Sequence, residues 1–158
     1  MAVRTPEEMI DWLESALQEQ RKGTALPWTI VHRSTGVPVG STRFGNIDLA
    51  NRRVEIGWTW IGGPWQRTAV NTESKYLMLR HAFESLGCVR VEFKTDALNE
   101  RSRKALLRIG AKEEGTLRRH MKTYSGRVRD TVYFSILDSE WPAVKAELET
   151  KLAGKLPR

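Results

Sequence analysis

The stretch Pro64-Trp-Gln-Arg-Thr-Ala-Val-Asn71, with the helical run that follows it to Phe83, is the segment around which the chain is organised. Hydrophobic side chains recur after it at spacings of three or four residues, which marks one face of an α-helix; they are Tyr76, Leu79, Phe83 and Leu86. We therefore expect a polar loop that leads into an amphipathic helix from about Thr72 to Leu86. The first N–H groups of a helix lack partners within it, and the helix dipole favours negative charge beside them. The stretch thus predicts an anion site at the start of this helix.

A segment of alternating hydrophobicity comes directly before the loop. Residues 53–61 place apolar side chains at every second position, namely Val54, Ile56, Trp58 and Trp60. This period of two predicts a strand with one apolar face, which puts Glu55 on the opposite face. Gly62-Gly63-Pro64 is expected to end the strand.

The remaining elements are predicted from caps, alternation and turn residues. Thr5-Pro6-Glu7-Glu8 combines the cap, proline and glutamate of a helix start, and Gly23 is expected to end that helix. Further strands are expected at 27–33, 37–44, 89–95, 114–123 and 130–137, with a polar connection at 46–52. Further helices are expected from Asn99 to Ile109 and from Asp138 onward, and the apolar face of the last one consists of Trp141, Val144, Leu148 and Leu152. No repeat or linker divides the sequence, so residues 1–158 are expected to form a single α+β domain.

Composition excludes several classes of protein. No run of 18 apolar residues predicts a membrane span, and no signal peptide is visible, so we expect a cytoplasmic protein. Cys88 is the one cysteine, which excludes an intrachain disulfide, and the three histidines show no metal-binding spacing, so no metal is expected. The formal charge of +7 suits a polyanionic cofactor, an acidic acceptor or nucleic acid. Nucleic acid ranks last, because no basic stripe with interleaved aromatic residues is present.

The segment Gln66-Arg67-Thr68-Ala69-Val70-Asn71 resembles the Gln/Arg-x-x-Gly-x-Gly/Ala pyrophosphate loop of the GNAT acetyltransferases. Glu55-Ile56-Gly57-Trp58 is similar to the central strand of that family, and residues 99–111 resemble its Asn-x-x-Ser…Gly-Phe segment. The similarity spans roughly residues 36–137 and is greatest to the subgroup that acetylates the N-termini of ribosomal proteins. It implies a GNAT fold, with a mixed, mostly antiparallel sheet flanked by helices. The usual first strand and helix of that fold are not found ahead of the helix at Pro6.

The resemblance implies acetyl-CoA as the acetyl donor and predicts where it binds. The residues expected at the coenzyme are Trp60, Ile61, Gln66, Arg67, Thr68, Ala69, Val70, Asn71, Thr72, Asn99 and Arg103. Ala69 and Asn71 depart from the glycines usual at these positions. A left-handed Ala69 would cost roughly 1–2 kcal/mol, whereas a right-handed Ala69 only has to keep its methyl group clear of the phosphate.

Two side chains are the catalytic candidates by resemblance. Glu55 is expected to accept the proton of the attacking amine through a water molecule; otherwise it is a strand residue paired with Arg53 or Arg43. Ser102 is expected to assist the departing thiolate; otherwise it is a serine on the helix surface. Asn99 has two compatible roles, as the N-cap of its helix and as a contact to the pantetheine arm.

The sequence therefore predicts an N-acetyltransferase that moves an acetyl group to a primary amine by direct attack. The acceptor is either a protein N-terminus or a small amine. The alternative is a non-catalytic acyl-CoA-binding module with the same fold. A homodimer is also expected, because an incomplete sheet edge needs cover.

Overall fold

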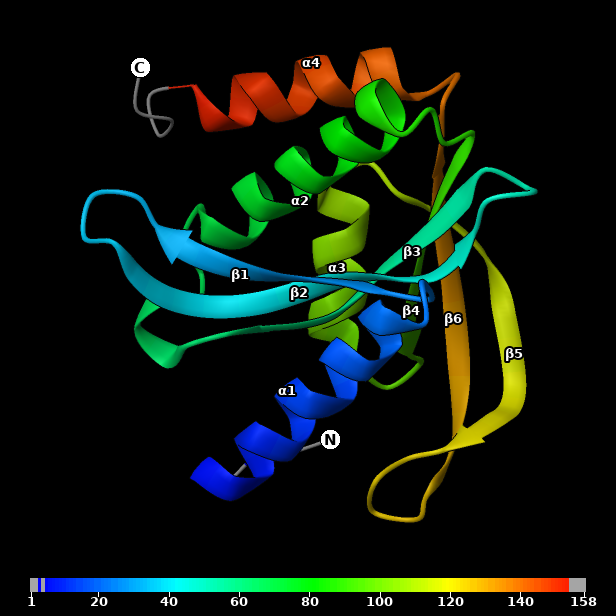
Figure 1. The fold of residues 1–158 in the computed structure, drawn as a ribbon. Coiled ribbons are helices and arrows are strands. Elements are labelled where there is room, and N and C mark those ends of the chain that lie inside the picture. Colours follow the sequence, from blue (N-terminus) through cyan, green and yellow to red (C-terminus); the bar gives the residue numbers. More distant parts are fainter. Residues whose placement is uncertain (1–2, 4, 154–158) are drawn as a thin grey trace.

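The structure is a computed structural model that describes residue 3 and residues 5–153 (Figure 1). The elements are α1 (Pro6–Arg21), β1 (Leu26–His32), β2 (Val37–Asp48), β3 (Arg53–Ile61), α2 (Val70–Arg80), β4 (Arg90–Asp96), α3 (Glu100–Arg108), β5 (Lys112–Lys122), β6 (Val128–Leu137) and α4 (Trp141–Leu152). The strands form one six-stranded sheet in the order β1-β2-β3-β4-β6-β5. Helix α1 covers one face of the sheet, whereas α2 and α4 lie together on the other. No helix in the described part of the chain is long and apolar enough to cross a membrane.

The start of α1 confirms the predicted cap. The Glu8 N–H donates to the Thr5 hydroxyl (3.2 Å), and the Thr5 N–H donates back to the Glu8 carboxylate (3.3 Å). This capping box satisfies two backbone donors that the helix itself leaves without partners. Gly23 follows the helix with a φ of 72°, a left-handed conformation that glycine adopts without strain.

The hydrophobic core lies between the sheet and the α2–α4 layer. Among its fully buried side chains are Phe44, Ile56, Leu79, Val91, Phe134 and Leu148. The predicted apolar face of the last helix is confirmed, since Trp141, Val144, Leu148 and Leu152 are all buried. That helix begins at Trp141 rather than at Asp138, because residues 138–140 form a turn.

The boundaries of β2 and α2 also differ from the sequence-based prediction, each by several residues. Strand β2 continues to Asp48 through the expected polar connection, because its ladder with β3 persists to the Asp48–Arg53 pair. Helix α2 starts at Val70 and ends at Arg80, and a π-helical turn, His81–Ser85, follows it. The wider turn rotates the end of the predicted apolar face away from the core, so Leu86 is 51% exposed.

A bulge in β3 reverses the alternation that the sequence predicts. Trp58 has a φ of 50°, and the register with β2 shifts between the Arg43 and Ser41 pairs. Beyond this point Trp58 and Trp60 project toward α1, on the face of Glu55 and away from Ile56. The Arg43 guanidinium lies 5.2 Å from the Trp58 ring centroid, and Trp12 of α1 lies 6.4 Å from Trp60. The prediction that all four apolar residues of β3 share one face is therefore wrong, because one extra residue changes the face of every later side chain.

The parallel ladder between β3 and β4 is short. It runs from the Arg53–Arg90 pair to the Glu55–Glu92 pair, whereas β4 stays paired with β6 as far as Asp96. Beyond Glu55, β3 keeps only β2 as a partner, and Figure 1 shows β3 and β4 diverging. The sheet is therefore open between these strands on the side where β3 leads to α2.

The end of β3 depends on a glycine in the neighbouring strand. A Cβ atom on Gly40 would lie 2.5 Å from the Trp60 carbonyl oxygen, which cannot move without its strand. We expect Gly40→Ala to reduce the free energy of unfolding by roughly 1–3 kcal/mol, measured by urea denaturation. Gly63→Ala is the matched control, since nothing lies within 4 Å of its added Cβ; equal stability of the two variants would contradict the prediction.

Candidate active site

The loop between β3 and α2 has the geometry that favours an anion. A 3₁₀ turn, Gly63–Trp65, precedes it, and the Thr68 hydroxyl donates to the Trp65 carbonyl oxygen (2.7 Å) and accepts from the Val70 N–H (3.3 Å). The first α-helical bond of α2 runs from the Glu73 N–H to the Ala69 carbonyl oxygen (2.9 Å). The N–H groups of residues 70–72 therefore precede the hydrogen-bonded part of the helix, where the helix dipole favours negative charge.

The structure decides between the two conformations considered for Ala69. Ala69 has φ −68° and ψ −18°, which is right-handed, so its methyl group adds no backbone strain. Asn71 lies inside α2. The left-handed residue of the loop is Arg67, with a φ of 63°.

Gln66 joins the loop to two neighbouring elements. Its side-chain amide donates to the Ile61 carbonyl oxygen (2.8 Å) at the end of β3. Its amide oxygen accepts from the Arg101 guanidinium (3.0 Å) in the first turn of α3. The end of β3, the loop and the start of α3, which the sequence analysis assigned to one site, are therefore in direct contact.

The start of α3 supports one of the two roles of Asn99. Its side-chain oxygen accepts from the Ser102 N–H (3.0 Å), which makes Asn99 the N-cap of α3. Ser102 is half-buried in the first turn of this helix. The Arg103 guanidinium forms an ion pair with Glu113 of β5 (3.1 Å) and donates to the Ala97 carbonyl oxygen (3.4 Å), so part of its charge is already matched.

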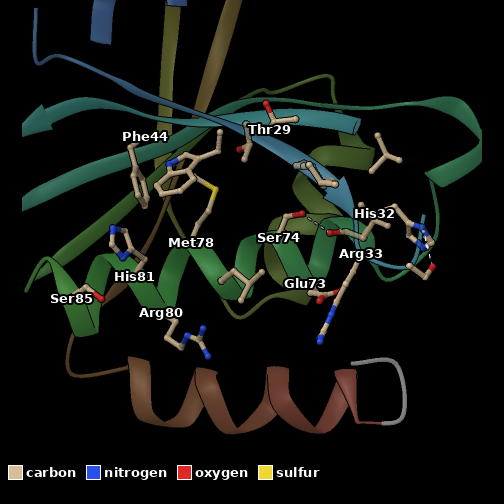
Figure 2. A pocket seen from close by; sticks show the side chains of 18 residues that line it. Thr29, His32, Arg33, Phe44, Glu73, Ser74, Met78, Arg80, His81 and Ser85 are labelled. Carbon is tan, nitrogen blue, oxygen red and sulfur yellow. Dashed lines mark hydrogen bonds between the residues drawn. The ribbon is translucent and has the colours of Figure 1, made fainter. Parts of the chain in front are cut away.

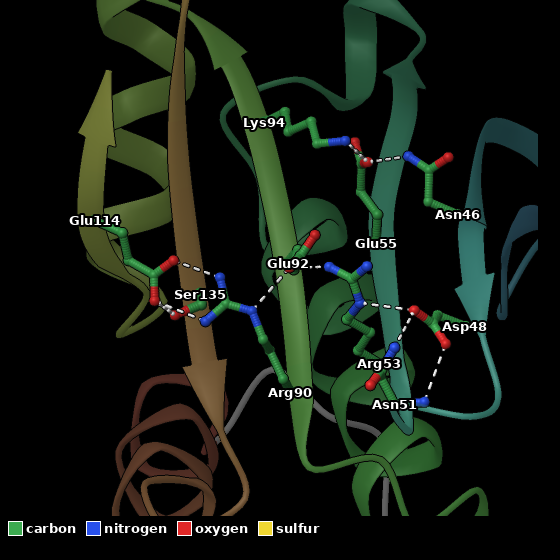
Figure 3. A network of polar contacts seen from close by, with 10 residues as sticks. All are labelled: Asn46, Asp48, Asn51, Arg53, Glu55, Arg90, Glu92, Lys94, Glu114 and Ser135. Atoms are coloured by element: carbon green, nitrogen blue, oxygen red, sulfur yellow. Dashed lines mark hydrogen bonds and ion pairs between the residues drawn. The ribbon is translucent and has the colours of Figure 1, made fainter. Parts of the chain in front are cut away.

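Glu55 is a buried carboxylate at the point where β3 and β4 separate. It is 6% exposed, and its Oε2 atom receives both the Lys94 ammonium (2.7 Å) and the Asn46 side-chain amide (2.6 Å; Figure 3). Burial lowers the pKa of Lys94, but the contact with Glu55 outweighs it and leaves that pKa raised. Lys94 therefore stays charged, and Oε1 of Glu55 takes part in neither contact. Neither Arg43 nor Arg53 is the partner of Glu55, as the sequence analysis had considered.

A network of ion pairs braces the strands beside Glu55 (Figure 3). Arg90 of β4 contacts Glu92 (2.8 Å) and, through a second nitrogen, Glu114 of β5 (2.7 Å). Arg53 contacts the same oxygen of Glu92 from β3 (3.2 Å). Hydrogen bonding to Arg90 lowers the pKa of Glu114 to about 2, so these charges persist at neutral pH. The network holds the paired end of β3 and β4 together, next to the point where they separate.

A large cavity lies on the opposite face of the sheet from Glu55. It is a groove of about 860 Å³ between the edge strand β1 and α2, and its lining includes Trp28, Phe44, Glu73, Met78, Arg80 and His81 (Figure 2). Its floor is apolar and its rim carries the charged side chains. Glu55 and Trp58 project to the α1 face and do not line this groove, whereas Val70 at the start of α2 does.

Sequence reasoning missed two polar residues of the site, Lys94 and Asn46, and the contact of Arg101 with Gln66. Lys94 and Asn46 lie 39 and 9 positions from Glu55, and Arg101 lies 35 positions from Gln66. A parallel pair of strands joined by a helix leaves no local signal of its register, so the contact between Lys94 of β4 and Glu55 of β3 could not be read from spacing.

Comparison with known proteins identifies the family of this chain. Residues 1–112 match the family model of the acetyltransferase (GNAT) domain. The chain belongs to the GNAT acetyltransferase family. The GNAT fold expected from the sequence, an α+β domain with a mixed sheet, is confirmed by this match and by the solved structures.

The relatives of this GNAT chain agree with the subgroup predicted from sequence. A Bacillus subtilis protein named "Putative ribosomal N-acetyltransferase YdaF" is 35% identical over 67% of the chain. The chain spans only 57% of that protein's length.

Two solved structures are similar over nearly the whole chain. A GCN5-related N-acetyltransferase from Brucella melitensis is 35% identical, with 96% of this chain and 66% of that chain covered, at a TM-score of 0.87. Mycobacterium smegmatis RimJ, solved in complex with CoA-disulfide, is 26% identical, with 93% and 69% covered, at a TM-score of 0.79. The expected absence of the first strand and helix of the fold stays a prediction.

Proposed function

We propose that this GNAT chain transfers an acetyl group from acetyl-CoA to a primary amine, and that a protein N-terminus is the favoured acceptor. The proposal rests on one observation: strands β3 and β4 separate beyond Glu55, and the opening between them lies between the Glu55 carboxylate and the start of α2. One side of this opening offers backbone N–H groups for a diphosphate, and the other offers Glu55 for the amine. Similarity to the ribosomal N-acetyltransferases favours a peptide acceptor over a small amine.

The residues at the loop fit the diphosphate of coenzyme A. The right-handed Ala69 leaves the first turn of α2 regular, so the N–H groups of Asn71 and Thr72 are positioned to donate to an anion. Arg67 contributes positive charge from the loop, and Arg101 does so across it through Gln66. Arg103 and Asn99 would border the pantetheine arm from α3. Bound acetyl-CoA would supply the activated thioester, and the chain would hold and orient it.

Glu55 is the proposed base. The amine must be neutral to attack, so its proton must pass to a positioned acceptor. Lys94 and Asn46 fix Oε2 of Glu55, which leaves Oε1 to receive a proton through a water molecule. The attack is direct: the amine nitrogen bonds to the acetyl carbon, the carbon–sulfur bond breaks, and the thiolate leaves.

The developing oxyanion needs an N–H donor at the open edge of β3. The Gly62 N–H donates to Val39 of β2 (2.9 Å), and successive N–H groups of a strand alternate in direction. The Ile61 N–H therefore faces away from β2, toward the side that β4 has left. The sequence analysis placed Trp60 and Ile61 at the coenzyme. Of these two, Ile61 is the better oxyanion donor, because the Trp60 N–H group faces β2.

Ser102 is proposed to assist the departing thiolate. The thiolate of coenzyme A is a good leaving group, because a thiol has a pKa of about 8.5. We therefore expect Ser102→Ala to lower kcat by less than about 10-fold. Initial rates at saturating acetyl-CoA, with Thr150→Ala at the far end of α4 as the control, test this expectation. A loss of three orders of magnitude would instead make Ser102 an essential acid.

The proposed function is tested by turnover. Purified protein is incubated with acetyl-CoA and a panel of N-terminal peptides and small amines, and release of free thiol is measured. We expect thiol release with at least one peptide and an acetylated N-terminus by mass spectrometry. Absence of product with every acceptor, under conditions where coenzyme A binds, would leave the alternative below.

The second candidate is a non-catalytic acyl-CoA-binding module. The contacts of Glu55 with Lys94 and Asn46 favour it, because a buried carboxylate held by an ammonium group and an amide can serve to join neighbouring strands instead of binding an acceptor. Calorimetry with coenzyme A separates the two candidates when combined with the turnover assay, since both bind the coenzyme and only the enzyme forms product.

A further inference from the structure

Lys75 is a lysine buried beneath the sheet, on the opposite face from Glu55. The residue is 6% exposed, and its side chain points from α2 into the space between β2 and β3. Its ammonium nitrogen donates to the Thr59 hydroxyl (2.6 Å) and to the Thr42 hydroxyl (3.3 Å). The two hydroxyl oxygens are 2.8 Å apart, and each lies 3.3 Å from the Gly57 carbonyl oxygen.

Burying the Lys75 amine in this cluster lowers the stability of the folded protein, because the amine loses its contact with water. Within the described residues Lys75 forms no ion pair, and its hydrogen-bond partners are two neutral hydroxyl groups. Burial lowers the pKa of its ammonium group to about 7. An apolar side chain at this place on α2 would avoid the desolvation of an amine, so stability alone does not account for a lysine.

The cluster lies beside the open edge of β3, because Gly57 and Thr59 belong to this strand. Gly57 and Thr59 flank Trp58, whose φ of 50° is unfavourable for a bulky side chain. Thr59 points into the interior because of this bulge, and the next residues are Trp60 and Ile61. A group that holds Thr59 inward therefore also sets the direction of the N–H groups that follow.

We propose that Lys75 is a positioning residue: with Thr42 and Thr59 it holds the bulge of β3, so that the Ile61 N–H faces the reacting carbonyl. The assignment rests on the proposed acetyl transfer. Lys75 itself touches neither donor nor acceptor in this proposal. Its contribution is to keep a strained backbone in one conformation at a site where a small displacement lowers the rate strongly.

The first test separates turnover from binding. We expect Lys75→Met to lower kcat by about 10-fold to 100-fold, while the dissociation constant for coenzyme A stays within about twofold, because the first turn of α2 is unchanged. Thr59→Val should lower kcat in the same direction, and Thr59→Ser, which keeps the hydroxyl, should restore it. Lys145→Met is the control, since Lys145 of α4 contacts Glu84 in the π-helical turn after α2 and not the bulge of β3.

The second test needs neither substrate. Hydrogen exchange of the backbone amides of residues 58–61 is expected to accelerate in Lys75→Met and in Thr59→Val, and to be unchanged in Lys145→Met. If Lys75→Met does not fold, Thr59→Val gives both readouts. Wild-type exchange rates together with wild-type kcat in Lys75→Met or Thr59→Val would overturn the proposal. Lack of turnover by the wild-type protein would overturn the proposed function instead, and the exchange rates would still decide whether Lys75 holds the bulge.

Discussion

Replacement of Glu55 by Gln is expected to lower kcat/KM by about 100-fold to 10,000-fold, the usual contribution of a positioned general base. Gln keeps the shape of the side chain and can still accept from Lys94 and Asn46, but it cannot take a proton from the amine. Affinity for coenzyme A should stay within about twofold, because the diphosphate is held by α2 on the other side of the opening. Steady-state kinetics and calorimetry on the same preparation measure both quantities.

Glu92→Gln is the matched control for this variant. Glu92 is also buried and is the partner of Glu55 across the β3–β4 ladder, but it belongs to the ion-pair network of Arg53 and Arg90. We expect it to reduce stability and to leave kcat/KM close to the wild-type value. Equal turnover by wild type and Glu55→Gln would show that Glu55 serves the strand pairing only.

Raising the pH from 7 to 9 is expected to stabilise the wild-type protein by about 2 kcal/mol relative to Lys75→Met. The folded-state pKa of Lys75 is lowered to about 7, below its value in the unfolded chain. Between these two values the unfolded chain binds the proton and the folded protein does not, so the free energy of unfolding rises with pH. The gain is complete only above the unfolded-state pKa, and it is lost as the pH falls toward 7.

Urea denaturation of both proteins across this pH range measures the difference. The Met variant lacks the titrating amine, so every other ionisable group contributes equally to the two curves. At pH 7 the variant is expected to be at least as stable as the wild type, because burial of the lysine is unfavourable there. Parallel curves would mean that Lys75 keeps an ordinary pKa in the folded protein.

Local signals predicted most of the fold. The capping box of α1, the apolar face of α4 and the strand at 53–61 depend on residues close together in sequence, and each is confirmed. The bulge at Trp58 could not be predicted, because it depends on the register that β2 imposes on β3. This single irregularity decides that Trp58 and Trp60 face α1 and that Thr59 faces α2.

The candidate site was predictable where it follows one stretch of chain. The loop at 66–72 and the cap at Asn99 carry recognisable patterns, and the structure brings them together through Gln66 and Arg101. The Lys94 partner of Glu55 depends on strand pairing, which sequence spacing does not show. Lys75 reads in the sequence as one more cation among 26 lysines and arginines, and only its burial sets it apart.

A crystal structure with coenzyme A tests the central claim most directly, since the account places the diphosphate at the first turn of α2. We predict that phosphate oxygens accept from the Asn71 and Thr72 N–H groups and that the pantetheine arm enters between β3 and β4, with its sulfur near Ile61. Coenzyme bound elsewhere, for example in the groove between β1 and α2, would contradict the acetyltransferase mechanism proposed for this chain.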